Sequence, residues 1–185
     1  MQHRNTLILT QSALTIIDMQ EAFRSKIPDF SEVAERIATM VKAATLLRLP
    51  IIVTEQYPKG LGHTASEILE VLPPTTEIIE KTTFSSCGVR PFQSQLDAVG
   101  AKQVMVCGIE AHICVNQTVH DLLASGVQVQ LLTDCITSRK KENKEIALRK
   151  MEISGAIPSS IEMALFEMMR DAKHEQFKAI QGLIK

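Results

Sequence analysis

Short apolar runs rich in β-branched residues alternate along this chain with longer segments of helical period. Unbroken apolar character over about four to six residues is typical of strands that are buried on both faces, as in a parallel sheet. The runs of this kind lie at Ala13–Ile17, Ile51–Thr54, Glu77–Glu80, Gln103–Gly108, Val127–Leu132 and Gly155–Pro158. The alternation therefore predicts a six-stranded parallel sheet.

The segments between these runs indicate helices. Ser31–Leu49 repeats apolar residues along one face, and Ser31 can cap its start. Further helices are expected over Cys114–Ser125 (followed by Gly126), Lys141–Ser154, Ser159 or Ser160 through Arg170, and His174–Ile184. Right-handed crossovers then place helices on both faces of the sheet, in a three-layer α/β/α architecture. Because no linker or repeat interrupts the 185 residues, we expect one domain over residues 1–185.

Composition excludes several classes of partner. The 20 basic and 21 acidic residues give a net charge of −1 without a basic stripe, and aromatic residues make up only 4%. Neither feature suits nucleic-acid binding. The apolar runs are shorter than the roughly 20 residues that span a bilayer, so no membrane partner is expected. Met1–Thr10 lacks the pattern of a secretory leader and the four cysteines lack CxxC spacing, which favours a reduced, cytoplasmic protein.

Three chemically useful residues stand at carboxyl ends of expected strands, where ligands bind in such sheets. Asp18 follows the first run, Lys81 follows the third, and Cys114 comes after the fourth, near a helix start. Each also has an ordinary interpretation, as a turn former, a surface lysine and a small buried side chain. A helix N-terminus and a nearby cation lower a thiol's pKa, so we expect Cys114 to be an activated nucleophile. Together the three groups predict nucleophilic catalysis.

Two loops loaded with Gly, Pro, Ser and Thr, Gln56–Thr64 and Thr82–Pro91, are expected to line the ligand pocket. Phe23, Tyr57 and Phe84 are candidate walls of an apolar slot that binds substrate, although core packing explains each of them almost as well.

These residues resemble the isochorismatase-like cysteine hydrolases. The matching segments are Asp18-Met19-Gln20 with Phe23 (the family's D-x-Q-x-x-F), Glu80-Lys81, Gly108–Val115 (G-x-x-T-x-x-C-V) and Asp134-Cys135-Ile136 (D-A-x). They occur in the family's order over about residues 13–160, which is most of the chain. The stretch Thr54–Gly62 is most similar to the isochorismatase-domain-containing subgroup.

The resemblance implies a Rossmann-like sheet of strand order 3-2-1-4-5-6 and a catalytic triad of Asp18, Lys81 and Cys114. It also implies a cis peptide between Ile109 and Glu110, and an oxyanion hole made by the backbone amides of Glu110 and Cys114. The implied activity is hydrolysis of a small-molecule amide or related acyl substrate at a non-peptide C–N bond. Cys114 would form an acyl-enzyme, with Asp18 as acid and base. Family members are often oligomers, so a homodimer or larger assembly is expected.

The sequence also departs from the family pattern. Ala111 stands where the family usually has Thr. Nicotinamidases of the family carry an Asp-x-His metal motif, which Glu55 and His63 do not restore here, so we expect no metal and no other cofactor. Two alternatives remain open. One is a catalytically silent binding module on the same fold, and the other is a thiol redox protein in which Cys107 or Cys87 resolves an oxidised Cys114.

Overall fold

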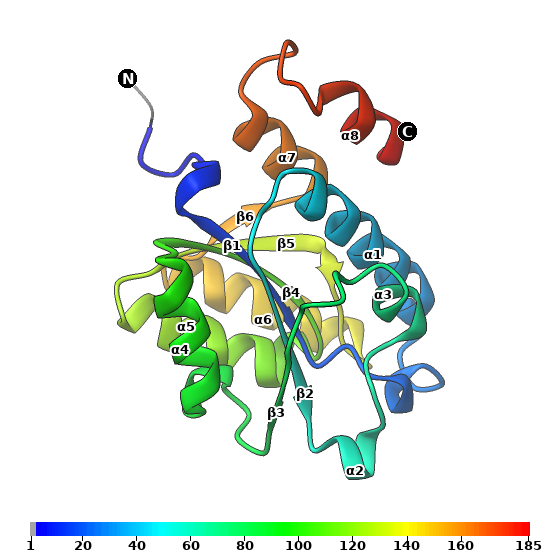
Figure 1. Ribbon diagram of the computed structural model, residues 1–185. Helices are drawn as coiled ribbons and strands as arrows, with labels where there is room; N and C mark the ends of the chain where they lie inside the picture. Colours follow the sequence, from blue (N-terminus) through cyan, green and yellow to red (C-terminus); the bar gives the residue numbers. More distant parts are fainter. Residues whose placement is uncertain (1–2) are drawn as a thin grey trace.

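The computed structural model describes residues 3–185, and its centre is a six-stranded sheet in the order β3-β2-β1-β4-β5-β6 (Figure 1). Every neighbouring pair of strands is parallel. The strands are β1 (Ser12–Ile17), β2 (Ile51–Gln56), β3 (Ile78–Lys81), β4 (Gln103–Gly108), β5 (Gln128–Ile136) and β6 (Ile157–Ser159). The predicted strand order is confirmed. Residues 1 and 2 of the expected domain lie outside the described residues.

Helices cover both faces of this sheet, which confirms the three-layer architecture (Figure 1). One face carries α1 (Phe30–Leu46), α3 (Ser66–Leu69), α7 (Ile161–Met169) and α8 (Phe177–Leu183). The other carries α4 (Arg90–Val99), α5 (Asn116–Ala124) and α6 (Lys141–Ile153). The shorter elements are η1 (Leu9–Gln11), η2 (Glu21–Phe23), α2 (Pro58–Leu61), η3 (Ser86–Gly88) and the π-helical turn η4 (Ala111–Val115).

Strand β4 shows how the two cores divide the sheet. Val104 and Val106 lie in the cluster beneath α4, α5 and α6, whereas Met105 and Cys107 lie in the cluster beneath α1 and α7, and all four are fully buried. Successive side chains of a strand point to opposite faces. A strand covered on both sides therefore requires the unbroken apolar run seen in the sequence. Within residues 3–185, no helix combines the length and apolar character of a membrane span.

Some element boundaries differ from those expected. Helix α4 was not predicted, although Phe92, Leu96 and Val99 recur along it at helical spacing and are a usable signal for a helix; only Phe92 of its ten residues is buried. Strand β5 continues to Ile136, so Asp134 and Cys135 lie within the strand and not after it. Helix α1 begins at Phe30, one residue before the expected cap Ser31. The expected helix from Cys114 divides into the turn η4 and the helix α5, and Ser160 caps α7 as predicted.

Gly108 brings the first and fourth strands together at their carboxyl ends. Its φ is +115°, and a Cβ atom there would lie 2.0 Å from the carbonyl oxygen of Ile17. Only glycine tolerates both the backbone angle and this close approach. The next amide, of Ile109, donates to the same Ile17 carbonyl oxygen at 2.9 Å. This contact places the residue after β1, Asp18, beside the segment that leads to Cys114.

Candidate active site

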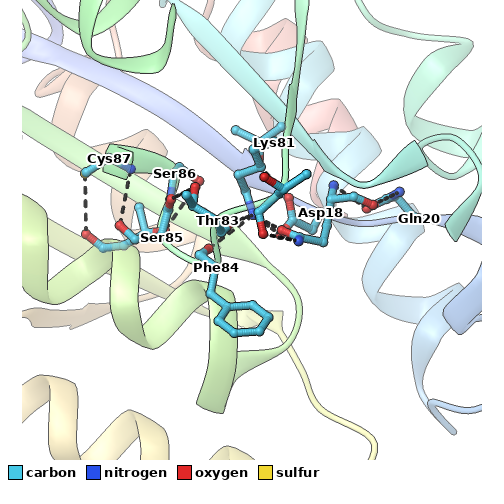
Figure 2. Close-up of polar contacts among 12 residues, drawn as sticks. Asp18, Gln20, Lys81, Thr83, Phe84, Ser85, Ser86 and Cys87 are labelled. Atoms are coloured by element: carbon cyan, nitrogen blue, oxygen red, sulfur yellow. Dashed lines mark hydrogen bonds and ion pairs between the residues drawn. The ribbon is translucent and has the colours of Figure 1, made fainter. Parts of the chain in front are cut away.

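Lys81 and Asp18 form a buried ion pair where β3 and β1 end (Figure 2). Lys81 Nζ lies 2.6 Å from Asp18 Oδ2, and the two side chains are 0% and 3% exposed. The other carboxylate oxygen, Oδ1, accepts a hydrogen bond from the Thr54 hydroxyl at 2.7 Å. A charge withdrawn from water this completely is tolerated only when it is paired and hydrogen-bonded. Both oxygens of Asp18 meet that requirement.

The Lys81 ammonium has three further acceptors. It donates to Gln56 Oε1 at 2.8 Å and to the carbonyl oxygens of Thr83 and Phe84 at 3.2 and 3.1 Å. Figure 2 shows the chain after β3 bending around the ammonium in this way, while the Phe84 ring points away from the ion pair. The loop that follows β3 is therefore built around the charge of Lys81. Lys81 is therefore a buried residue whose charge is paired with Asp18 and whose hydrogen bonds hold the loop, and it is not a solvated surface lysine.

Cys114 lies in the turn η4, only 7% exposed, beside both members of the ion pair. Burial raises the pKa of its thiol to about 12, and the adjoining Asp18 carboxylate adds to this effect while Lys81 opposes it. The expectation of a lowered thiol pKa is therefore wrong, because desolvation and an anion outweigh the cation and the helix start. The arrangement is a neutral thiol next to a carboxylate base, not a preformed thiolate.

The other cysteines lie outside this arrangement. Cys107 and Cys135 are fully buried in β4 and β5, and burial raises the pKa of both thiols. Cys87 lies half-buried in η3, where burial, reinforced by Asp121, raises its pKa to about 11. Cys114 is thus distinguished by its neighbours Asp18 and Lys81.

Two of the three expected slot residues are near the surface. Tyr57 and Phe84 are each 54% exposed, and Phe23 lies in η2 and packs against the core beneath α1. Tyr57 lines a cavity of about 380 Å³ together with Lys81 and Val89. Tyr57 and Lys81 therefore line one cavity, whereas Phe23 packs against the hydrophobic core.

The peptide bond between Ile109 and Glu110 is cis. Directly after it, the Glu110 carboxylate is buried and contacts Arg139 Nε at 2.7 Å. Sequence reasoning missed this side-chain pair, because nothing in the local pattern joins the two positions. It also missed Gln56, although the parallel register that sets Gln56 against Lys81 is a usable signal for the contact.

Glu55 and His63, which replace a metal motif, have a different arrangement. The buried Glu55 carboxylate accepts hydrogen bonds from the Thr64 backbone N–H at 2.6 Å and its hydroxyl at 2.7 Å, and lies 3.2 Å from His63 Nδ1. These contacts anchor the segment after α2. Over residues 3–185, no group of three His, Cys, Asp or Glu side chains is arranged to hold a metal ion.

Comparison with known proteins agrees with this fold. The isochorismatase domain matches residues 12–163. Isochorismatase domain-containing protein 2 is 42% identical in Homo sapiens (94% of this chain, 83% of that protein) and 41% in Danio rerio (94% and 86%). A solved structure from Caenorhabditis elegans, named MAR1 ribonuclease, is 40% identical and superimposes with a TM-score of 0.92 over 97% of this chain and 92% of its own. The chain belongs to the isochorismatase domain family.

Proposed function

We propose that this chain is a cysteine hydrolase acting on a small-molecule amide or related acyl substrate at a non-peptide C–N bond. The observation that carries the proposal is the buried Asp18–Lys81 ion pair beside the Cys114 thiol. A buried ion pair is weak evidence of stability, since apolar residues of similar volume often serve equally well. A nucleophile, a base and a cation at one point are what covalent acyl transfer requires. Membership of the isochorismatase domain family supports the same class of reaction.

In the proposed mechanism, the Cys114 sulfur attacks the substrate carbonyl carbon as Asp18 takes the thiol proton. This order suits a thiol whose pKa is about 12, because deprotonation then accompanies bond formation. The tetrahedral intermediate collapses as Asp18 passes the proton to the departing nitrogen, leaving a thioester on Cys114. Asp18 next deprotonates a water, which attacks the thioester and releases the acid, and the proton returns to the sulfur. Lys81 stabilises Asp18 in each step in which the Asp18 side chain is deprotonated and negatively charged.

The negative oxygen of that intermediate needs hydrogen-bond donors, and the backbone amides of Glu110 and Cys114 are the candidates. Among residues 3–185, the Glu110 N–H has no hydrogen-bond acceptor. An amide left free next to a nucleophile supports an oxyanion role, since preorganised N–H groups stabilise charge as it develops.

The proposal is tested with a panel of small primary and secondary amides, measuring amine or ammonia release and intact protein mass after rapid quench. We expect turnover with an acyl adduct in the wild-type protein and neither in Cys114→Ala. Asp18→Asn is expected to form the adduct more slowly. Turnover without any adduct under rapid quench would contradict the covalent route.

RNA cleavage is a second candidate, because the C. elegans structure that is 40% identical is named a ribonuclease. The net charge of −1 and the 4% aromatic content offer little for backbone binding or base stacking. Incubating end-labelled RNA with wild type and Cys114→Ala separates the two. Cleavage that both proteins perform equally would exclude the cysteine site as its source. Cleavage lost only in the variant would replace amide hydrolysis with RNA chemistry at the same site.

A binding module and a thiol redox protein predict other outcomes. A module without turnover would show no Cys114 adduct with any acyl compound. A redox protein would form a Cys114 disulfide with Cys87 or Cys107 after peroxide, which peptide mapping detects. We expect no silent module, because the Asp18–Lys81 pair beside Cys114 supplies the groups that turnover needs. We expect no disulfide, because Cys107 is fully buried and burial raises the pKa of both potential resolving thiols.

We also propose a single hydrolase domain that assembles as a homo-oligomer and works in the cytoplasm. The family resemblance supports assembly, and Ile146 and Ile153 of α6 supply apolar side chains that are 67% and 77% exposed. The four cysteines are free thiols, which suits a reducing compartment. Light scattering after gel filtration measures the assembly, and a monomer at micromolar concentration would contradict it.

A further inference from the structure

Three consecutive residues after β5 each contact one residue of the segment that leads to Cys114. The Ala111 N–H donates to the Thr137 carbonyl oxygen at 2.9 Å. His112 Nδ1 lies 3.0 Å from Ser138 Oγ. Arg139 binds the Glu110 carboxylate. The segment 137–139 therefore lies against residues 110–112 and contacts every one of them.

The contact between Arg139 and Glu110 is the strongest of the set. Arg139 Nε lies 2.7 Å from Oε1 and Nη2 lies 3.1 Å from Oε2, and the backbone N–H of Arg139 also donates to Oε1 at 3.1 Å. Both carboxylate oxygens are thus engaged by the planar guanidinium fork, a geometry that sets orientation as well as energy. The Glu110 side chain is 3% exposed and that of Arg139 is 50% exposed. The arginine reaches from the surface to a buried carboxylate.

The segment that carries Arg139 is itself anchored. The Thr137 hydroxyl donates to Asp29 Oδ1 at 2.6 Å, directly before α1, and the Thr137 N–H donates to the Gly108 carbonyl oxygen at 3.4 Å. Arg139 therefore extends from a segment held by α1 and β4. Because the backbone before Arg139 is held in place, the ion pair fixes the position of the Glu110 carboxylate relative to α1 and β4.

We propose that the Glu110–Arg139 pair positions the Glu110 backbone N–H as a hydrogen-bond donor to the oxyanion formed over Cys114. The inference rests on the proposed hydrolase function, and it adds Arg139 as a positioning residue. The side chain and the N–H of Glu110 share one Cα, so holding the carboxylate at two points restricts the rotation of the amide. Arg139 touches no reacting atom and acts only through Glu110.

The test compares two thiol reagents on Cys114. Acrylamide forms a bond from sulfur to its terminal alkene carbon and places negative charge on the amide oxygen, and the thiol proton ends on the carbon next to the carbonyl. Methyl methanethiosulfonate forms a disulfide and expels methanesulfinate, the thiol proton passing to solvent, with no carbonyl involved. The ratio of the two rate constants reports on stabilisation of the carbonyl oxygen and cancels changes in thiol exposure. Glutathione supplies the ratio for an unassisted thiol.

We expect the wild-type ratio to exceed that of glutathione, and Arg139→Ala to lower it about tenfold, since misplaced donors stabilise little charge. Arg139→Lys keeps the charge but not the two-point grip, and is expected to fall in between. Lys141→Ala is the matched control, because it removes a cation two residues away whose only ion pair is with Glu145 among residues 3–185. Its ratio is expected to equal that of the wild type.

The double variant Glu110→Gln with Arg139→Ala separates positioning from stability. It leaves no unpaired buried carboxylate, so its melting temperature is expected to recover towards that of the wild type while its reagent ratio stays low. Recovery of both quantities would assign the pair to stability alone and overturn the inference. An elevated wild-type ratio that folded Arg139→Ala retains would overturn it too. A wild-type ratio equal to that of glutathione would remove the proposed oxyanion donor itself, and the inference with it.

Discussion

Replacing Lys81 with Met tests how strongly the buried ion pair is integrated into the fold. The substitution keeps a side chain of similar length and removes the ammonium, which is fully buried and serves Asp18, Gln56 and two carbonyl oxygens. Removing one member of a buried pair typically costs about 3–5 kcal/mol, because the other charge stays buried without a partner. For a chain of this size, 1 kcal/mol corresponds to roughly 2–4 °C. We therefore expect the melting temperature of Lys81→Met to fall by about 6–20 °C.

Urea denaturation followed by circular dichroism measures the free energy of unfolding of Lys81→Met, Asp18→Asn and the double variant. The double variant contains no unpaired charge, so it is expected to be more stable than Lys81→Met, with a coupling energy of about 2 kcal/mol or more. Cys114→Ala leaves the pair intact and serves as the control for a change in the same site. A loss below about 1 kcal/mol in Lys81→Met, the range of an exposed ion pair, would refute the reasoning.

Three further outcomes are expected. Gly108→Ala is expected to prevent folding, seen as a loss of soluble, helical protein, because its Cβ would meet the Ile17 carbonyl oxygen at 2.0 Å; a folded variant would contradict this close approach of β1 and β4. Burial and Asp18 raise the pKa of Cys114 from 9.0 to about 12, so above pH 9 the unfolded chain releases a proton that the native state retains. The free energy of unfolding therefore falls as pH rises from 9 towards 12, and Cys114→Ala is expected to make this fall shallower in urea titrations; an unchanged slope would contradict the raised pKa. Ser160→Ala is expected to destabilise the protein by about 1 kcal/mol by removing the cap bond to the Met163 N–H, whereas Ser160→Asp is expected to retain most of the stability.

The sheet could be predicted from the sequence because a strand that is buried on both faces consists of an unbroken run of apolar residues. The apolar run of β4 has the predicted bounds, and its residues divide between the two cores. The positions of Asp18 and Lys81 at the ends of expected strands likewise predicted that the two side chains lie together. Helix α4 was missed although Phe92, Leu96 and Val99 recur at helical spacing, because its first residues, Arg90 and Pro91, continue the segment Thr82–Pro91, whose Gly, Pro, Ser and Thr residues indicate a loop.

Other properties of the site depend on tertiary contacts that no local pattern encodes. The pKa of Cys114 was predicted to fall and is instead raised, because its burial is a property of the packed site. Glu110 and Arg139 lie 29 residues apart, and either charge taken alone is typical of a solvated surface. Gln56 is an intermediate case, since only the register between β2 and β3 places it against Lys81.

The most direct test of the central claim is to map the acyl group after reaction with p-nitrophenyl acetate, a general acyl donor. We expect a burst of p-nitrophenol and an acetyl group on the Cys114 peptide, absent in Cys114→Ala and formed about 100-fold more slowly in Asp18→Asn. An acetyl group found only on Cys87 or on lysines, or a burst that Cys114→Ala retains, would contradict the assignment of Cys114 as the nucleophile.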